Sequence, residues 1–297
     1  MIVVRRPGPL TTIQDLGRPG YAHLGVPHAG AADVASLRLA NRLVGNDEGA
    51  AALEITLVGP ELHFLSPTFV AATGGHVDAV ANGRPVAMNA AFRVPADGVL
   101  SIGSVQTGVR TYLGVRGGVD VPPVLGSRST DTLSGLGPPK LAYGQELPLG
   151  PAGPAQPWET VVPTPPIETE PVLRVALGPR DNHFDTTAVE VLCQTRWTVT
   201  VRSDRSGVRL EGPPLRWRGQ RELESEGMVT GAIQVPSDGQ PIVFLANHPT
   251  TGGYPVIAVV VSADLPLAAQ ARPGTPLHFR TADAAIPSDG APPPLGR

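Results

Sequence analysis

Lysine, cysteine and aromatic residues are scarce in this chain of 297 residues, of which 4% are aromatic. Lys140 is the only lysine among 23 basic residues, and it lies in Pro-Pro-Lys-Leu. This context excludes the phosphate-binding loop G-x-x-x-x-G-K-[ST], which requires a lysine. It also excludes a biotin-attachment lysine flanked by methionines. Any use of ATP or biotin therefore requires other groups or a partner.

Cys193 is the single cysteine, so an intrachain disulfide is excluded and a reducing cytoplasm is expected. It follows Val-Glu-Val-Leu, which predicts a buried small hydrophobic residue and not a nucleophile. Charged residues make up 16% of the chain with a net charge of −3, which argues against nucleic-acid binding. No apolar run approaches 18 residues, and the first ten residues do not resemble a signal peptide, so we expect a cytoplasmic protein.

Glycine and proline are abundant, with 35 and 34 residues. Because 41% of the chain is hydrophobic and lies in short runs between these residues, the sequence predicts a mainly β fold with few helices. Short strands are expected at residues 2–4, 53–57, 62–65, 69–72, 76–80, 99–102 and 109–115. Asn82-Gly83 is typical of a hairpin turn. Residues 148–171 contain eight prolines, which predicts an extended, semi-rigid linker between two halves.

Three helices are predicted. The first follows Asp33 as N-cap, with apolar residues at helical spacing up to Val44. The second follows Thr187, whose spacing to Glu190 is that of a capping box. The third spans residues 265–271, with Asp264 as N-cap and Pro273-Gly274 after it.

Residues 14–33 form the first polar cluster, in which glycines and prolines impose a tight path on Gln14, Asp15 and Arg18. Loops before a helix N-terminus can bind anions, and arginine adds a planar fork for a carboxylate or phosphate. The residues alone leave open whether Asp15 and Arg18 bind a ligand or pin the loop to itself. His23 and His28 are five residues apart with no further ligand cluster, so no metal site is expected.

Residues 202–212 form a second cluster, which contains Asp204 and Arg205. It is either a site for an acidic ligand or a solvated hairpin with local ion pairs. A third cluster, residues 250–255, combines two hydroxyls with Gly252 and Gly253 before the most apolar run of the chain. Glycines allow a ligand to approach the backbone closely, which favours a binding loop.

These clusters, in this order, resemble the biotin-dependent carboxyltransferase-like family, which includes the C subunit of 5-oxoprolinase, allophanate hydrolase subunit 2 and the carboxyltransferase subdomains A and B of urea amidolyase. The resemblance covers about residues 2–280. Its motifs lie at residues 9–20, 25–33, 39–41, 53–54, 125–130, 203–212, 224–227, 231–236 and 251–255.

The resemblance implies two cyclophilin-like β-barrel domains, at residues 1–160 and 161–281, and a flexible tail at 282–297. It implies one component of an ATP-dependent 5-oxoprolinase that opens 5-oxoproline to glutamate, with the A and B subunits of that enzyme as partners and ATP with Mg²⁺ bound at or with a partner. A first alternative is carboxyl transfer to urea or a related acceptor from carboxybiotin supplied in trans. A second is a regulatory binding subunit of a kinase-inhibitor pair.

The motifs also imply site residues. Catalytic roles are expected for Asp15, Arg18, Glu54 and Arg205. Substrate-binding roles are expected for Gln14, Arg128, Asp204, Gln234, Thr250, Thr251, Gly252, Gly253 and Tyr254. The chain departs from the family pattern at Ala29, where serine is usual, and at residues 247–249, which read Asn-His-Pro in place of Asp-Arg-Gln.

Overall fold

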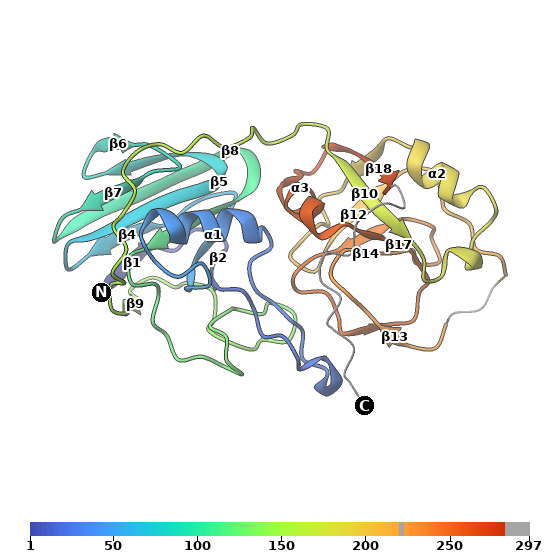
Figure 1. Cartoon of the computed structure of the whole chain (residues 1–297), viewed down its shortest axis with the longest axis horizontal. Helices are drawn as coiled ribbons and strands as arrows, with labels where there is room; N and C mark the ends of the chain where they lie inside the picture. Colours follow the sequence, from blue (N-terminus) through green and yellow to red (C-terminus); the bar gives the residue numbers. More distant parts are fainter. Residues whose placement is uncertain (220–222, 283–297) are drawn as a thin grey trace, which may run out of the picture.

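The computed structural model describes residues 1–219 and 223–282, and it consists of two β halves joined by one extended segment (Figure 1). The mainly β architecture with few helices is confirmed. The predicted tail lies outside the described residues apart from Ala282. Among the described residues, no helix is long and apolar enough to cross a membrane.

The first half is a nine-stranded sheet in which β5 and β8 are the longest strands. The order along its main path is β2-β3-β8-β4-β1-β9, and β5 pairs with β6, β7 and β8. Its strands are β1 (Ile2–Arg6), β2 (Thr11–Gln14), β3 (Ala52–Thr56), β4 (Glu61–Phe64), β5 (Thr68–Ala81), β6 (Arg84–Val86), β7 (Ala91–Val94), β8 (Gly98–Val115) and β9 (Glu146–Leu147).

The prediction of separate short strands was wrong at two places. Residues 69–72 and 76–80 belong to the single strand β5, and residues 99–102 and 109–115 belong to β8. Gly74, with φ of 85°, lies where the register between β5 and β8 shifts, so the glycine makes a bulge and does not end the strand. The hairpin at Asn82-Gly83 is confirmed, since both residues have positive φ between β5 and β6.

One face of this sheet is polar. Thr12, Glu54, Tyr112 and Thr73 lie side by side across β2, β3, β8 and β5, and all four are buried. Because side chains alternate along a strand, the opposite face carries residues such as Leu53 and builds the apolar core. The polar face needs a polar cover, which the rest of the chain supplies.

Helix α1 (Val34–Leu43) packs on β5 and β8 of this sheet (Figure 1). Its predicted cap is confirmed, because the Asp33 carboxylate accepts from the Ser36 backbone N–H at 3.0 Å. Helix α2 (Ala188–Gln194) also forms, but the Thr187 side chain makes no capping bond.

Helix α3 (Leu265–Gln270) forms without the predicted Asp264 cap. A 3₁₀ turn, η3 (Ser262–Asp264), precedes it, and the Asp264 carboxylate instead binds Arg174 at 2.7 Å. Two further 3₁₀ turns are η1 (Ala22–Leu24) and η2 (Asp181–His183).

Cys193, predicted to be buried, is half-buried on α2, and burial raises the pKa of its thiol.

The second half is a closed barrel around Trp197, Phe184 and Ile257. Its order is β10-β17-β14-β15-β12-β11-β18, and the parallel pairing of β10 with β18 closes it. Its strands are β10 (Val172–Leu177), β11 (Trp197–Val199), β12 (Gly207–Glu211), β14 (Ala232–Gln234), β15 (Ile242–Phe244), β17 (Val256–Val260) and β18 (Pro276–Thr281). A separate ribbon pairs β13 (Glu226–Gly227) with β16 (Thr251–Gly252).

The strands of the sheet end at Leu147 and those of the barrel begin at Val172, so the proline-rich segment 148–171 joins them. The segment lies along the first half: Trp158 N–H donates to the Leu43 carbonyl at 2.7 Å, and Ala91 N–H donates to the Trp158 carbonyl at 2.8 Å. The predicted domain boundary at residue 160 stays a prediction.

We expect Gly74→Ala to destabilise the protein by about 2–4 kcal/mol. The backbone φ at residue 74 is unfavourable for alanine, and the new β-carbon would lie 2.7 Å from the Arg110 carbonyl oxygen. Gly83→Ala is the matched control, since Gly83 has a similar φ of 77° and open space around it. Its expected cost is about 1 kcal/mol. Urea unfolding of both variants measures the difference, and equal losses would contradict the close approach at the bulge.

Candidate functional site

Glu54 is the centre of a buried polar network between the two halves. Its side chain is inaccessible to solvent on β3, and its Oε2 accepts from Tyr112 Oη at 2.7 Å and from Ala32 N–H at 3.0 Å. Its Oε1 pairs with Arg205 and lies 3.7 Å from Arg110 Nε. Burial raises the pKa of Glu54, but Arg205 and Arg110 outweigh burial and hold it below its usual value. Glu54 is therefore an ionised carboxylate.

Arg205 enters this network from the barrel, in the turn before β12, with its side chain 2% exposed. Its Nη1 pairs with Glu54, its Nη2 donates to the Gly30 carbonyl, and its Nε donates to Asn247 Oδ1 at 2.6 Å. Asn247 in turn donates from Nδ2 to the carboxylate of Asp131. One guanidinium thus ties the barrel to the sheet, to the loop before α1 and, through Asn247, to Asp131.

Four residues of the junction were missed by the sequence analysis: Arg110, Tyr112, Asp131 and Gln270. Arg110 donates to the Ala269 carbonyl and, at 3.3 Å, to the Asp204 carbonyl. Gln270 of α3 accepts from the backbone N–H groups of residues 109 and 110 and donates to Asp33 at 2.8 Å. For Arg110 and Tyr112 the signal was the alternation along β8, which places both side chains on one face of the sheet.

Asp15 and Arg18 form a second buried part of the same junction. The Asp15 carboxylate accepts from Ser127 Oγ at 2.6 Å, from Ser129 Oγ and from the Arg128 backbone N–H at 2.6 Å. Arg18 donates to the Ser129 carbonyl. Burial lowers the pKa of Arg18, while the charges of Asp131 and Asp15 oppose this shift. Both residues pin the loop, which is one of the two interpretations that the sequence left open.

Gln14 lies beside them on β2 and is fully buried. Its Nε2 donates to Thr12 Oγ1 and to the Thr130 carbonyl, both at 3.0 Å. It therefore fastens the segment at Thr130 to the edge of the sheet.

Two predicted binding residues lie at the surface with local partners. The Arg128 guanidinium pairs with Asp120 at 2.6 Å. The exposed Asp204 carboxylate accepts from the backbone N–H of Ser206 at 2.7 Å and so shapes the turn that carries Arg205. Both side chains have structural partners in the chain itself.

The remaining predicted binding residues form a separate group in the barrel half. Gln234 donates to the Tyr254 carbonyl at 3.1 Å, and a β-carbon on Gly252 would lie 2.5 Å from Gln234 Nε2. Thr251 and Gly252 form β16, while the Thr250 carbonyl accepts from Met228 N–H and the Gly253 carbonyl accepts from Leu223 N–H. Residues 250–254 of this group follow the junction residue Asn247 closely along the chain.

Two clefts lie where the two halves meet. The first, of about 590 Å³, is bordered by residues 28–38 and by residues 245–246 and 262–266 of the barrel half. The second, of about 460 Å³, lies beside Arg110, Asp204 and Arg205, with Leu133 and the exposed Val201 at its edge. Each is lined by residues of both halves.

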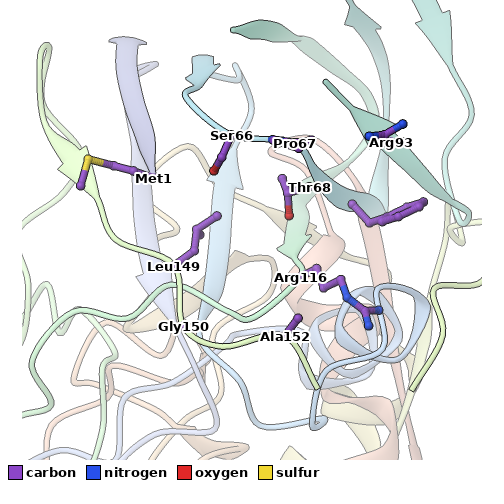
Figure 2. A pocket seen from close by; sticks show the side chains of 10 residues that line it. Met1, Ser66, Pro67, Thr68, Arg93, Arg116, Leu149, Gly150 and Ala152 are labelled. Carbon is purple, nitrogen blue, oxygen red and sulfur yellow. The ribbon is translucent and has the colours of Figure 1, made fainter. Parts of the chain in front are cut away.

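A third cavity, of about 460 Å³, lies on the first half and is lined by none of the predicted site residues (Figure 2). Arg116 lines it together with Met1, Thr68 and Leu149. The Arg116 guanidinium donates to the carbonyls of Gly153 at 2.9 Å and Ala155 at 2.8 Å. Its role is to hold the proline-rich segment on the sheet.

The described residues contain no group of three or more His, Cys, Asp or Glu side chains that could hold a metal ion. His28 is exposed and bonds the Ala29 carbonyl at 3.0 Å. His248 is buried and stacks on Phe244 with ring centroids 5.7 Å apart. Burial lowers the pKa of His248, so its imidazole is neutral near pH 7.

The model of the family named carboxyltransferase domain, subdomain A and B, matches residues 24–281. The chain belongs to this family. It is 38% identical over 290 residues to the C subunit of 5-oxoprolinase from Escherichia coli K12, an alignment that covers 94% of this chain and 90% of that protein. The family resemblance predicted from the motifs is confirmed.

Urea amidolyases are also similar, but to a small part of their length. The chain is 36% identical to urea amidolyase of Lachancea kluyveri, covering 93% of this chain and 16% of that protein. It superposes on the crystal structure of K. lactis urea amidolyase with a TM-score of 0.89 and 35% identity, covering 94% of this chain and 18% of that chain. This carboxyltransferase-family chain thus matches one segment of those enzymes.

We expect Glu54→Gln to destabilise the protein by about 3–5 kcal/mol, because the buried Arg205 and Arg110 lose their anionic partner. The pKa of Glu54 is lowered by folding, so its contribution is present above its unfolded pKa and is lost as pH falls through the folded value. The difference in free energy of unfolding between the variant and the unmodified chain should therefore become smaller at low pH. Chemical unfolding from pH 3 to 7 measures it, with Glu48→Gln, in an exposed pair with Arg42, as control.

We expect Asn247→Asp to add a carboxylate beside Asp131 and Arg205. Because Glu54 already pairs with Arg205, we expect repulsion by Asp131 to prevail, so that the two carboxyl groups share a proton and their apparent pKa rises. A carboxyl group whose pKa is higher in the folded than in the unfolded protein destabilises the fold once it is ionised, that is, at higher pH. The unfolding temperature of the variant should therefore fall, relative to the unmodified chain, as pH rises from 5 to 8. Parallel profiles for the two proteins would show that Asn247 and Asp131 are not coupled.

Proposed function

We propose that this chain is the C subunit of an ATP-dependent 5-oxoprolinase, which opens 5-oxoproline to L-glutamate and works with the A and B subunits of that enzyme. The alignment with the corresponding Escherichia coli protein supports this most strongly, because it covers 94% of one chain and 90% of the other. The two proteins therefore correspond almost end to end.

A biotin-dependent carboxyltransferase acting on urea or a related acceptor is the second candidate. It is favoured by the superposition on K. lactis urea amidolyase with a TM-score of 0.89. In this case carboxybiotin is supplied in trans by another protein. The chain corresponds to only 18% of that enzyme, so the first candidate is preferred.

The described residues do not fit a complete site for ATP and Mg²⁺. They contain no metal-binding cluster, and Lys140 is the only lysine in the sequence. The guanidinium groups of Arg18, Arg128 and Arg205 are bonded to groups of the protein. In this proposal the nucleotide and its metal bind at or with a partner subunit.

Asp15, Arg18, Glu54 and Arg205, which the motifs place in the catalytic site, act in this proposal as positioning residues. Glu54 and Arg205 bond each other and the backbone of the loop before α1, while the side chains of Asp15 and Arg18 bond residues 127–129. They contribute to activity by holding the two halves and the loop before α1 in the arrangement that binds the substrate and the partner subunits. Since each is buried and charged, loss of one is costly.

The test is turnover by the chain copurified with the A and B subunits. We expect phosphate release that requires 5-oxoproline and equals the glutamate formed. Arg205→Ala should lower this rate at least tenfold, because it opens the junction, and Arg209→Ala, at the exposed face of β12, should leave it unchanged. An intact complex without turnover would overturn the proposal, and inhibition by avidin would then favour the carboxyltransferase.

A further inference from the structure

We propose that the first cleft, between residues 28–38 and barrel residues 262–266, binds a small organic carboxylate, and that the buried network behind it holds its wall in place. The cleft measures about 590 Å³ and is lined by both halves. Identifying the carboxylate as 5-oxoproline rests on the proposed function, whereas the preference for a carboxylate with an apolar body rests on the cleft alone.

Residues 28–33 form one wall of the cleft, and hydrogen bonds on the side away from the cleft hold residues 28–31 in place. The His28 carbonyl accepts from Arg18 N–H at 2.7 Å, and Ala31 N–H donates to the Asp15 carbonyl at 3.0 Å. Between them, the Gly30 carbonyl accepts from the Arg205 guanidinium. These bonds hold a strained path, since Ala29 has φ of 54°, a conformation that residues other than glycine rarely adopt.

Glu54 and Tyr112 hold residues 32 and 33 of the wall in place. Ala32 N–H donates to Glu54 Oε2 at 3.0 Å, and Asp33 N–H donates to Tyr112 Oη at 2.8 Å. Tyr112 Oη also donates to Glu54 at 2.7 Å. The buried charges of the junction thus converge on one short segment whose other side faces the cleft. This accounts for why so many charged groups are buried at one place.

The surface that faces the cleft is apolar and made of small residues. Ala29, Ala31 and Ala32 form it on the wall, and Leu245 and Leu265 lie across from them on the barrel. Small side chains leave volume for the hydrocarbon part of a ligand. Burial of that hydrocarbon part in the cleft would favour binding.

The charge at the cleft is positive. Among the described residues that line it, Arg38 is cationic and none is acidic. Arg38 is not neutralised fully, because its partner Glu48, 3.5 Å away, is 2.7 Å from Arg42. One carboxylate therefore serves two guanidinium groups. A ligand carboxylate near Arg38, with its apolar body against the alanines, complements both features.

The experiment is a titration of the full chain, labelled with ¹³C in the alanine methyl groups, followed by NMR. The probes are 5-oxoproline, cyclopentanecarboxylate, which keeps the ring and the carboxylate, and 2-pyrrolidinone, which lacks the carboxylate. We expect both carboxylates to shift the methyl signals of Ala35 and Ala263, assigned with Ala35→Ser and Ala263→Ser, and 2-pyrrolidinone to leave them unchanged.

Arg38→Gln is the decisive variant, and Arg42→Gln is its matched control. Both arginines lie on α1, are exposed and pair with Glu48, but only Arg38 lines this cleft. We expect Arg38→Gln to weaken binding of both carboxylates about fivefold, and Arg42→Gln to leave it within twofold. Equal effects of the two variants, or no shift by either carboxylate at 50 mM, would overturn the proposal.

Tyr112→Phe tests the positioning role of the network. It removes the bond from Asp33 N–H on the wall and the bond to Glu54 while retaining the ring, so we expect a folded protein that binds the carboxylates about threefold to tenfold more weakly. Unchanged affinity would overturn this role.

The cleft and the proposed function can fail separately. Binding of both carboxylates by a chain whose complex does not hydrolyse ATP would uphold the cleft and reject the oxoprolinase. Binding of cyclopentanecarboxylate but not 5-oxoproline would uphold the cleft and reject 5-oxoproline as its ligand.

Discussion

The ion pair between Glu54 and Arg205 is the contact on which the arrangement of this molecule depends. It joins an inaccessible carboxylate of the sheet to a guanidinium of the barrel, and both members also bond the backbone of the loop before α1. Buried ions are costly unless all their hydrogen-bonding groups are satisfied. Here most of the buried charges face opposite charges: the junction buries three guanidinium groups and four carboxylates, namely Arg18, Arg110 and Arg205, and Asp15, Asp33, Glu54 and Asp131.

The polar sheet face explains why the two halves associate through charged groups. A row from Thr12 through Glu54 and Tyr112 to Thr73 crosses four strands and cannot pack against an apolar barrel. Helix α1, the loop before it and the Arg205 turn supply matching donors and acceptors. Such an interface is specific in geometry, because a shifted arrangement would leave charges unpaired. The same precision is what a ligand cleft between two halves requires.

Much of the fold was predictable from local signals, and much of the site was not. Helix α1, its Asp33 cap and the Asn82-Gly83 turn depend on neighbouring residues, and all were predicted correctly. Strands β5 and β8 were divided because a glycine at a bulge and a glycine at a turn look alike in sequence. The roles of Asp15, Arg18 and Arg205 depend on partners more than 100 residues away, such as Ser129 and Glu54, which no local pattern identifies. The motifs indicated which residues matter, but not which distant partners they bond.

The proline-rich segment also limits how far the two halves can move. It is fastened to the first half as far as Thr164, which bonds Asn89, and to the barrel half from Glu170, which pairs with Arg196. The five residues between them span at most about 18 Å when fully extended. If the junction opened, the halves would stay tethered at high effective concentration and would close again as a hinge. Opening of the junction would therefore not separate the molecule into two bodies.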